Sequence, residues 1–222
     1  MARATRPSPS RVDSKNVRRP KLTRLEKGQK IHESLFSAAA KVVGREGYAN
    51  AMVSMITSEA EVAQGTFYNY FESRQDLFDK LLPSLGAEML SFIREESSAA
   101  TNALEREERS FRAFFTFLKM RPEFYRILYE AELFAPAAFS RHTETIAKGY
   151  ARMLERAAKN GELRQTDAQA LEAISYILMG ARHYLCMRFA RVDGKTVSLP
   201  EWVVRVYMDQ VANGVYLEAP ND

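Results

Sequence analysis

Hydrophobic residues recur at helical spacing along almost the whole chain after residue 22. The first run contains Ile31, Leu35, Ala38 and Val42, which follow one another at intervals of three or four residues, so their side chains share one face of a helix. Gly47 comes directly after this run, and glycine is typical of a helix end. The pattern therefore predicts a first helix that ends just before Gly47.

The start of this helix is marked by a capping pattern. Thr23 and Glu26 have the spacing of a capping box, in which each side chain accepts a hydrogen bond from a free backbone amide of the other residue. Residues 1–22, by contrast, are rich in Arg, Pro and Ser and show almost no apolar periodicity. We expect them to form an unstructured arm.

Two short helical segments follow, at residues 53–60 and 64–70, and only Glu61, Val62 and Ala63 separate them. Two short helices across a tight turn are typical of a helix-turn-helix motif. A longer amphipathic helix then begins after residue 73 and connects this unit to the rest of the chain. We expect a helix-turn-helix domain over residues 23–82.

The remaining chain continues in the same periodic manner, and no stretch alternates convincingly with a period of two residues. Prolines and glycines divide it into helical runs. The pattern predicts an all-α protein of about nine helices, in which a helical bundle over residues 83–218 follows the N-terminal domain. The predicted runs of the bundle are residues 103–120, 123–134, 137–160, 166–191 and 200–215.

Composition narrows the class of protein. No apolar stretch approaches the roughly 18 residues that a membrane span needs, and the basic N-terminus has no apolar core like that of a secretory signal. The single cysteine, Cys186, excludes an internal disulfide and any multi-cysteine metal site. We expect a cytoplasmic protein that does not insert into membranes.

The charge of the chain is concentrated at one end. Residues 1–30 hold ten Lys or Arg residues against only Asp13 and Glu26, whereas the net charge of the whole chain is +4. Such an asymmetry favours a polyanion near the N-terminus, because cations placed beside phosphates release condensed counterions. A solvated, disordered tail is the alternative interpretation of residues 1–20.

One segment carries a specific resemblance. The sequences GTFYNYF at residues 65–71 and SRQDL at residues 73–77 resemble the most characteristic part of the TetR (tetracycline repressor) family. The resemblance covers residues 25–82, about a quarter of the chain. It implies a DNA-binding domain whose recognition helix is residues 64–70, followed by a divergent domain for ligand sensing and dimerisation.

The residue types of the recognition helix suit that role. Phe67 and Phe71 lie four residues apart, so we expect both to anchor the short helix on the core. A two-turn helix cannot bury four aromatic rings on one side, so we expect the tyrosine hydroxyls to reach phosphates, with core packing as the alternative. Side-chain amides can pair with adenine in the major groove. The expected DNA-binding residues are Gln64, Gly65, Thr66, Tyr68, Asn69, Tyr70 and Arg74, together with Arg18, Arg19 and Arg24 before and at the start of the first helix.

The segment also departs from the family pattern. Ala51 and Met52 stand where the second helix usually has a Thr or Ser cap, so Asn50 or Ser54 would have to cap it. Glu61 occupies a turn position that is often Gly and must accept a less comfortable backbone conformation. The usual Ser cap of the recognition helix is replaced by alanine at position 63.

For the bundle, the resemblance implies a small-molecule effector and a homodimer. The bundle is rich in aromatic and methionine side chains, which suit either a core or a mostly apolar cavity with a few polar groups. Arg182 and His183 are possible ligand anchors or, equally, surface groups. We expect the last two helices to pack against their copies in the partner. The expected pocket residues are Phe117, Phe124, Leu128, Tyr129, Tyr150, Met153, Tyr176, Met179 and His183.

No catalytic motif is visible, and we expect neither an enzyme nor a cofactor. His183 and Cys186 lie three residues apart on one helix but have no further metal ligand near them in sequence. The most concrete hypothesis is a repressor that binds a near-palindromic operator in double-stranded DNA and is released by its ligand. A ligand-independent DNA-binding regulator and a helical enzyme or small-molecule-binding protein are the alternatives.

Overall fold

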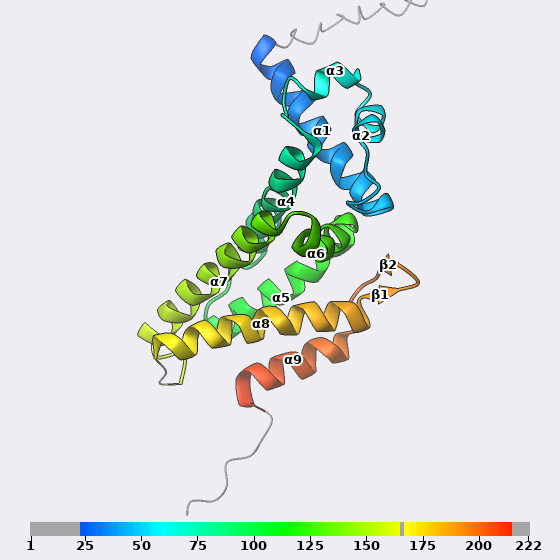
Figure 1. The fold of residues 1–222 in the computed structure, drawn as a ribbon. Helices are drawn as coiled ribbons and strands as arrows, with labels where there is room; N and C mark the ends of the chain where they lie inside the picture. Colours follow the sequence, from blue (N-terminus) through cyan, green and yellow to red (C-terminus); the bar gives the residue numbers. More distant parts are fainter. Residues whose placement is uncertain (1–22, 165–166, 215–222) are drawn as a thin grey trace, which may run out of the picture.

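The computed structural model describes residues 23–164 and 167–214, and within these ranges it contains nine helices and one short hairpin (Figure 1). The all-α class expected from the periodicity is confirmed. In chain order the elements are α1 (Arg24–Glu46), α2 (Val53–Glu59), α3 (Gln64–Phe67), α4 (Arg74–Glu96), α5 (Ala103–Met120), α6 (Glu123–Phe134), α7 (Pro136–Lys159), α8 (Ala168–Phe189), β1 (Arg191–Val192), β2 (Lys195–Thr196) and α9 (Glu201–Asn213).

The molecule has a small head and a larger bundle, joined by one helix. The head consists of α1, α2 and α3, and the bundle of α5 to α9, while α4 runs from the head into the bundle (Figure 1). Pro83 lies inside α4, and the helix continues beyond it to Glu96. The boundary expected after residue 82 thus falls within a continuous helix, so the head and the bundle share α4.

The capping pattern at the start of α1 is present in full. The backbone N–H of Thr23 donates to Glu26 Oε2 at 2.7 Å, and the backbone N–H of Glu26 donates to Thr23 Oγ1 at 3.2 Å. The helix ends at Glu46, and Gly47 follows with a φ of 82°, a left-handed value that favours glycine. Both predicted ends of the first helix are confirmed.

The expected cap of the second helix is wrong. Met52 occupies the N-cap position of α2, and no side chain caps the helix. Asn50 instead turns back toward α1, where its side-chain amide donates to the backbone carbonyl of Glu46 at 3.3 Å. Ser54 lies inside α2 and does not cap it either. The start of α2 therefore depends on packing rather than on capping.

A β-hairpin between α8 and α9 corrects the expectation of helices alone. The antiparallel strands pair Arg191 with Thr196 and Val192 with Lys195, and α8 ends at Phe189 instead of continuing to residue 191. The turn residues Asp193 and Gly194 have φ values of 50° and 75°, as a type I′ turn requires. The sequence Asp193-Gly194 is typical of such a turn. The two-residue strands are too short to show an alternating pattern of apolar and polar side chains.

Close contact between α1 and α6 holds the head on the bundle. A Cβ atom added at Gly44 would overlap the Cβ atom of Glu123, so the two backbones approach to a distance that only glycine permits. Nearby, Arg126 donates to the carbonyl of Arg45 at 2.8 Å, and Glu130 accepts from the backbone N–H of Tyr48 at 2.8 Å. These contacts bind the C-terminal end of α1 and the following turn to α6.

Replacing Gly44 with alanine tests this contact. The added methyl group pushes α1 away from α6, so we expect the free energy of unfolding to fall by about 1–3 kcal/mol, as for other overpacked sites. Gly149 in α7 is the matched control, because nothing lies within 4 Å of a Cβ atom built there. Gly149→Ala should gain up to ~1 kcal/mol from helix propensity. Equal midpoints of denaturant unfolding for the two variants would contradict the contact.

Candidate functional site

The expected recognition residues lie together at the tip of the head, away from the bundle (Figure 1). Gln64, Gly65, Tyr68 and Asn69 are exposed, and Thr66 is half-buried. Their side chains form a polar surface around α3, and Tyr68 is 56% exposed. An exposed polar surface of this kind is what contact with the major groove of DNA requires.

The recognition helix is shorter than the expected residues 64–70. It ends as an α-helix at Phe67, and the chain continues as a turn in which the backbone N–H of Asn69 donates to Thr66 and that of Tyr70 donates to Phe67. Bonds to the third preceding residue tighten the backbone in place of further α-helical turns. No side chain caps α3 at Ala63, as the missing serine had indicated.

Two phenylalanines fix α3 on the head. Phe67 and Phe71 are almost completely buried, which confirms their expected anchoring role. The ring of Phe71 lies 5.4 Å from that of Phe36 and stacks on His32 at 5.5 Å, so α1 provides the surface on which the turn rests. Periodicity did not single out His32, whose ring is part of this aromatic cluster.

Tyr70 is half-buried and belongs partly to the aromatic cluster. Its ring lies 6.1 Å from that of His32. Its hydroxyl is 3.7 Å from the position that a Cβ atom would take at Gly28, so the hydroxyl lies against α1. Tyr68 projects outward to a greater extent, which makes it the better placed of the two tyrosines for a phosphate.

The guanidinium of Arg74 already has partners in the head. It donates to the backbone carbonyls of Ala49 at 3.5 Å and Ala51 at 3.4 Å and lies over the ring of Phe78. Arg74 therefore braces the turn before α2, and its expected phosphate contact stays a prediction. Arg24 is exposed at the first turn of α1. Arg18 and Arg19 lie outside the described residues.

The turn between α2 and α3 shows the backbone conformation expected of it. Glu61 has a φ of 55°, in the left-handed region that non-glycine residues rarely adopt. The backbone N–H of the next residue, Val62, donates to the carbonyl of Thr57 at 3.0 Å, which closes the end of α2. The turn sets the angle between the two short helices.

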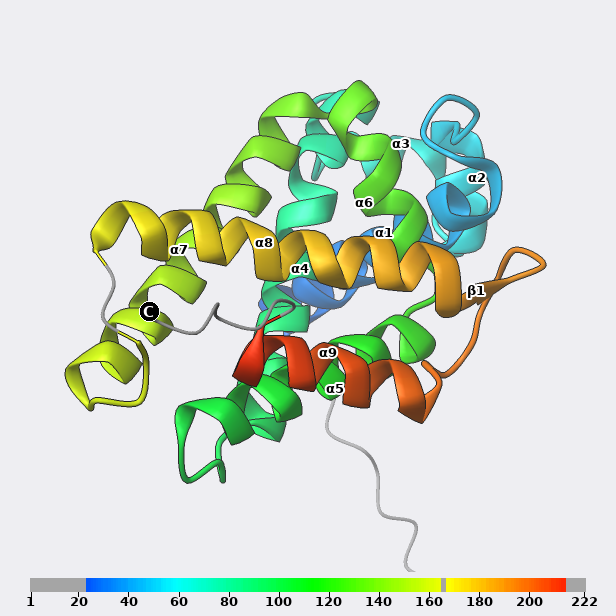
Figure 2. The same ribbon diagram turned by 90° about the horizontal axis from the view of Figure 1, so that it is seen from below.

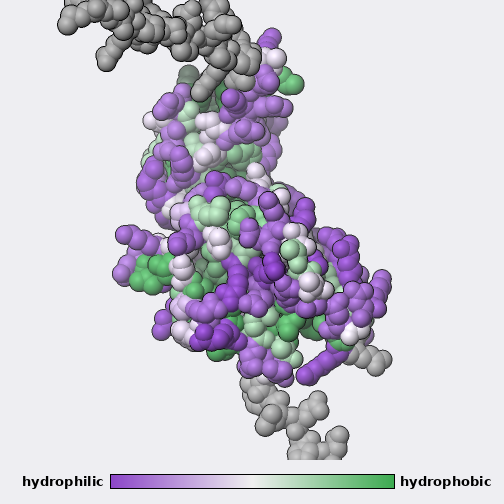
Figure 3. Space-filling view, turned by 180° about the vertical axis from the view of Figure 1, so that it is seen from behind, coloured by the Kyte–Doolittle hydropathy of each residue, from purple (hydrophilic) through white to green (hydrophobic). Residues whose placement is uncertain are grey.

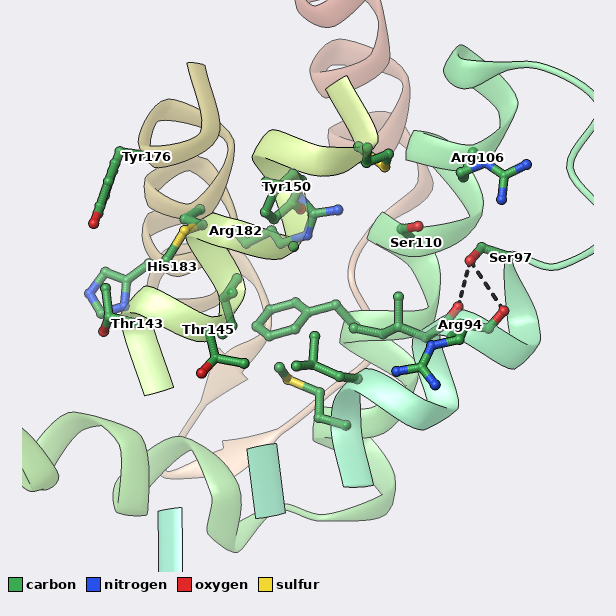
Figure 4. A pocket seen from close by; sticks show the side chains of 18 of the residues that line it. Arg94, Ser97, Arg106, Ser110, Thr143, Thr145, Tyr150, Tyr176, Arg182 and His183 are labelled. Carbon is green, nitrogen blue, oxygen red and sulfur yellow. Dashed lines mark hydrogen bonds between the residues drawn. The ribbon is translucent and has the colours of Figure 1, made fainter. Parts of the chain in front are cut away.

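A cavity of about 960 Å³ lies inside the bundle between α4, α5, α6, α7 and α8 (Figure 4). Its apolar wall includes Met89 and Ile93 from α4 and Phe114 and Leu118 from α5. Seven of the nine expected pocket residues also line it, namely Leu128, Tyr129, Tyr150, Met153, Tyr176, Met179 and His183.

The other two expected residues, Phe117 and Phe124, do not line the cavity. Both are almost completely buried, and their rings meet edge to face at 5.5 Å. They form core contacts between α5 and α6 behind the cavity wall. Helical periodicity identifies a buried face but cannot distinguish packing against another helix from packing against an empty volume.

A buried ion pair supports one wall of the cavity. Arg182 on α8 lies 2.9 Å from Glu107 on α5, and both side chains are more than nine-tenths buried. The hydroxyl of Tyr207 on α9 donates to Glu107 and accepts from Arg182 at 3.3 Å. Burial is the largest influence on Arg182 and opposes its charge, but Glu107, Tyr150 and Tyr207 together outweigh burial and raise the pKa of the guanidinium. The interpretation of Arg182 as a surface group is therefore wrong.

Glu107 was missed at the sequence level although a signal was present. It precedes Phe111, Phe114 and Leu118 by four, seven and eleven residues, so a carboxylate stands in line with the apolar face of α5. A charge at such a position needs a buried partner of opposite sign. Arg182 occupies the corresponding place on α8, between Leu178 and Cys186.

One part of the cavity wall is cationic. Arg94, Arg152 and Arg156 line the cavity and are exposed, and no carboxylate of the described residues forms an ion pair with them. Arg106 also lines the cavity (Figure 4) and donates to the carbonyl of Ala100 at 3.2 Å. These cations suit an anionic group at the solvent-facing part of an apolar ligand.

His183 and Cys186 do not assemble a metal site with other residues. The ring of His183 stacks on Tyr129, and its Nε2 atom lies 2.6 Å from the tyrosine hydroxyl. Burial raises the pKa of the Cys186 thiol to about 11, so the thiol is protonated at neutral pH. In the part of the chain that the structure describes, no three His, Cys, Asp or Glu side chains are grouped to hold a metal ion.

Helices α8 and α9 present apolar side chains to the outside. Ile177 and Tyr184 on α8 are 67% and 66% exposed, and Trp202 and Val206 on α9 are 49% and 53% exposed. The two helices lie next to each other on the near face in Figure 2. Figure 3 shows the molecule from behind the view of Figure 1, and this face is mostly hydrophilic, with its larger hydrophobic areas on the bundle. None of the described helices is long and apolar enough to cross a membrane.

Comparison with known proteins gives one family match in the head and two relatives that each match part of the chain. Residues 35–81 match the family described as "Bacterial regulatory proteins, tetR family". The fatty acid metabolism regulator protein of Bacillus subtilis is 29% identical over 72 residues, and the HTH-type regulator YhgD of the same organism is 29% identical over 87 residues. These matches cover 32% and 39% of this chain but only 37% and 44% of the two relatives.

Solved structures share the fold over most of the chain. A putative TetR-family transcriptional regulator from Syntrophomonas wolfei has a TM-score of 0.71 and 16% identity, and the match covers 86% of this chain and 99% of that one. FadR from Bacillus subtilis in complex with stearoyl-CoA has a TM-score of 0.67 and 16% identity, with 83% and 100% covered. At such identities the likeness concerns the fold alone.

The matched residues 35–81 contain α2, α3 and the turn between them, and they extend into α1 and α4. The shared fold extends through the bundle. The head of this chain thus matches the tetR family of bacterial regulatory proteins, and the chain as a whole shares its fold with solved regulators of that family.

Proposed function

We propose that this protein is a dimeric transcription regulator that binds operator DNA through α3 and releases it when an acyl ligand enters the bundle. The observation that carries the proposal is the course of α4. Its N-terminal part packs in the head, where Lys80 lies 5.6 Å from the ring centre of Phe71, and Met89, Leu90 and Ile93 near its other end line the cavity. A single helix thus joins the head that carries α3 to the space for a ligand.

The exposed residues around α3 supply the contacts to DNA in this proposal. Gln64 and Asn69 carry amides that can pair with base edges, and Tyr68 projects a hydroxyl at the same surface. Phe67 and Phe71 face the opposite way, into the core. The two phenylalanine rings are thus buried, and the polar side chains around α3 remain exposed for contact with a major groove.

The ligand class is supported by the cavity and by a relative. The cavity volume of about 960 Å³ and its apolar wall suit a long hydrocarbon chain, and the exposed arginines Arg94, Arg152 and Arg156 suit an anionic head. FadR of Bacillus subtilis, which shares the fold, has been solved in complex with stearoyl-CoA. We therefore propose a fatty acyl compound with an anionic group as the effector.

Release of DNA requires that the ligand prefer one arrangement of the bundle. A ligand shifts an equilibrium only by its difference in affinity for the two states. Because α4 forms part of the cavity wall, an acyl chain that fits one position of α4 better than another changes the position of the head. In a dimer this changes the spacing of the two α3 helices, which has to match about one turn of DNA.

The proposed dimer is formed by the exposed apolar face of α8 and α9. Ile177, Tyr184, Trp202 and Val206 gather apolar area on two adjacent helices, which a second copy would cover in a symmetric four-helix contact. Burying this area also explains why α9 exposes a tryptophan.

DNA binding is tested with fragments from upstream of the protein's own gene. We expect the full chain to retard such a fragment, and Gln64→Ala or Asn69→Ala to weaken binding, because each good base contact contributes about 1–3 kcal/mol. Gln169→Ala, an exposed change on α8, is the matched control and should leave affinity unchanged. A full chain that fails to retard any fragment even at low salt would sink the proposal.

Ligand response is tested with stearoyl-CoA in the same assay. We expect stearoyl-CoA to lower the affinity for DNA, and Arg94→Gln combined with Arg156→Gln to raise the concentration needed about tenfold, because charge-assisted hydrogen bonds to the head are lost. Arg109→Gln is the control, since Arg109 pairs with Glu105 and does not line the cavity. Undiminished DNA binding at saturating stearoyl-CoA would favour a ligand-independent regulator.

Dimerisation is tested by placing a charge on the α8–α9 face. Trp202→Asp and Ile177→Asp should each convert the dimer to a monomer at micromolar concentration, because a carboxylate would be buried without a partner. Mass measured by light scattering after size exclusion checks this. Leu133→Asp on α6, which is 77% exposed, should leave the dimer intact. A wild-type chain that is monomeric contradicts the assignment.

A further inference from the structure

Four residues that line the cavity form one stripe along α5. From the N-terminal end of the helix they are a cation, a hydroxyl and two apolar side chains, spaced four residues apart, so all four share one face. The hydroxyl interrupts a face that is otherwise apolar beyond the cation. The four residues are Arg106, Ser110, Phe114 and Leu118.

Helix α7 lines the cavity in the same order. Its cation, hydroxyl and apolar side chains are Arg156, Tyr150, Ile146 and Phe139. The backbone N–H of Ala103 at the start of α5 donates to Glu162 just after α7, so the two cations lie at the same end of the cavity. Each hydroxyl follows its cation by four residues on α5 or six on α7, which places it about 6–9 Å further in along the helix axis.

The hydroxyl of Tyr150 faces the cavity. It makes no hydrogen bond with a described residue, and unlike the hydroxyl of Tyr48 it is not closed off from solvent. The ring itself lies deep inside the bundle, where burial raises the pKa of the phenol well above its usual range. The open space beside this hydroxyl is therefore the cavity, and the phenol is protonated and can donate.

Ser110 supplies a second hydroxyl in this part of the cavity (Figure 4). Ser175 donates to the backbone carbonyl four residues before it at 2.8 Å, but Ser110 makes no such bond, and its oxygen is not closed off from solvent. It lies in the same turn of α5 as Glu107 and Phe111, which both contact Arg182. This hydroxyl is thus free for a ligand.

The guanidinium of Arg182 lies beside both hydroxyls. Its central carbon is 5.1 Å from the ring centre of Tyr150 and 5.3 Å from that of Phe111, the residue after Ser110. The ion pair with Glu107 balances its charge. A ligand carboxylate placed here would lose its hydration and meet Glu107 as well as the guanidinium, whereas an uncharged oxygen would lose far less.

We propose that Tyr150 and Ser110 bind an uncharged oxygen of the effector, further into the cavity than the anionic group that the arginines bind. The proposal rests on the acyl ligand class proposed above and makes that class more specific. Two kinds of acyl compound present such an oxygen. One is a fatty acid with a hydroxyl or keto group on its chain, and the other is an acyl thioester whose carbonyl lies here while its anionic carrier lies among the arginines.

The test uses two sets of probes whose members differ by one oxygen. The first set is octadecanoic acid and hydroxyoctadecanoic acids with the hydroxyl at successive positions in the first half of the chain. The second set is stearoyl-CoA and its thioether analogue S-octadecyl-CoA, which lacks the carbonyl oxygen. Displacement of a fluorescent fatty acid from the full chain gives each dissociation constant.

We expect the wild-type protein to bind an oxygen-bearing member of one set about fivefold more tightly than the member without that oxygen, as one hydrogen bond provides. A preference in the first set identifies a substituted chain as the source of the oxygen. A preference in the second set identifies the thioester carbonyl.

The variants show whether the two hydroxyls cause this preference. Tyr150→Phe removes a hydroxyl but keeps the ring that packs on Arg182, and Ser110→Ala removes the other hydroxyl. Each should lower the preference, and the double variant should abolish it. Tyr176→Phe is the matched control and should keep the preference, because Tyr176 lines the cavity but lies apart from both hydroxyls (Figure 4). Each ratio compares two probes on one protein, so a general loss of stability does not change it.

Two results overturn the inference. One is a wild-type protein that prefers no oxygen-bearing probe in either set, as expected if the two hydroxyls bind only water. The other is a preference that the double variant retains. Failure of the proposed function is seen separately: a fluorescent fatty acid that does not bind contradicts the acyl ligand class itself, and the DNA mobility assay tests DNA binding whichever acyl compound binds best.

Discussion

The close approach of α6 to α1 is the constraint on which the rest of the arrangement depends. Gly44 lets the two backbones meet, and Arg126 and Glu130 then bind the C-terminal end of α1 and the turn after it. Because α6 also carries Tyr125, Leu128 and Tyr129 in the cavity wall, the head is attached to an element whose position the cavity contents influence. The attachment and the sensing surface share one helix.

A cavity inside a helical bundle weakens the packing of the surrounding helices, which other interactions have to stabilise. Side chains lining a void lose packing contacts on one side, which weakens the wall. The ion pair between Arg182 and Glu107, extended by Tyr207, joins α8, α5 and α9 at one side of the cavity. Its charges are costly to bury, but breaking it would leave either charge unpaired, so the pair holds these helices in one register.

Local signals were sufficient for the order of the helices and for the ends of α1. Thr23 with Glu26 marks the start of α1, and Pro122 and Pro136 separate α5, α6 and α7 where the periodicity breaks. What periodicity could not provide is the difference between two kinds of buried side chain. Phe124 packs on α5 and Tyr150 faces the cavity, although both belong to apolar faces, because the outcome depends on helices far away in sequence. Glu107 is significant only through such distant neighbours.

The short length of α3, four residues, affects how the protein can evolve. Its order comes from Phe67 and Phe71 beneath it, since neither a cap nor its own length stabilises it. The outward positions, Gln64, Gly65 and Asn69, contribute little to that order. Under the DNA contacts proposed above, substitutions there alter which sequence is read at almost no cost in folding, so a duplicated gene can acquire a new target site while its scaffold stays intact.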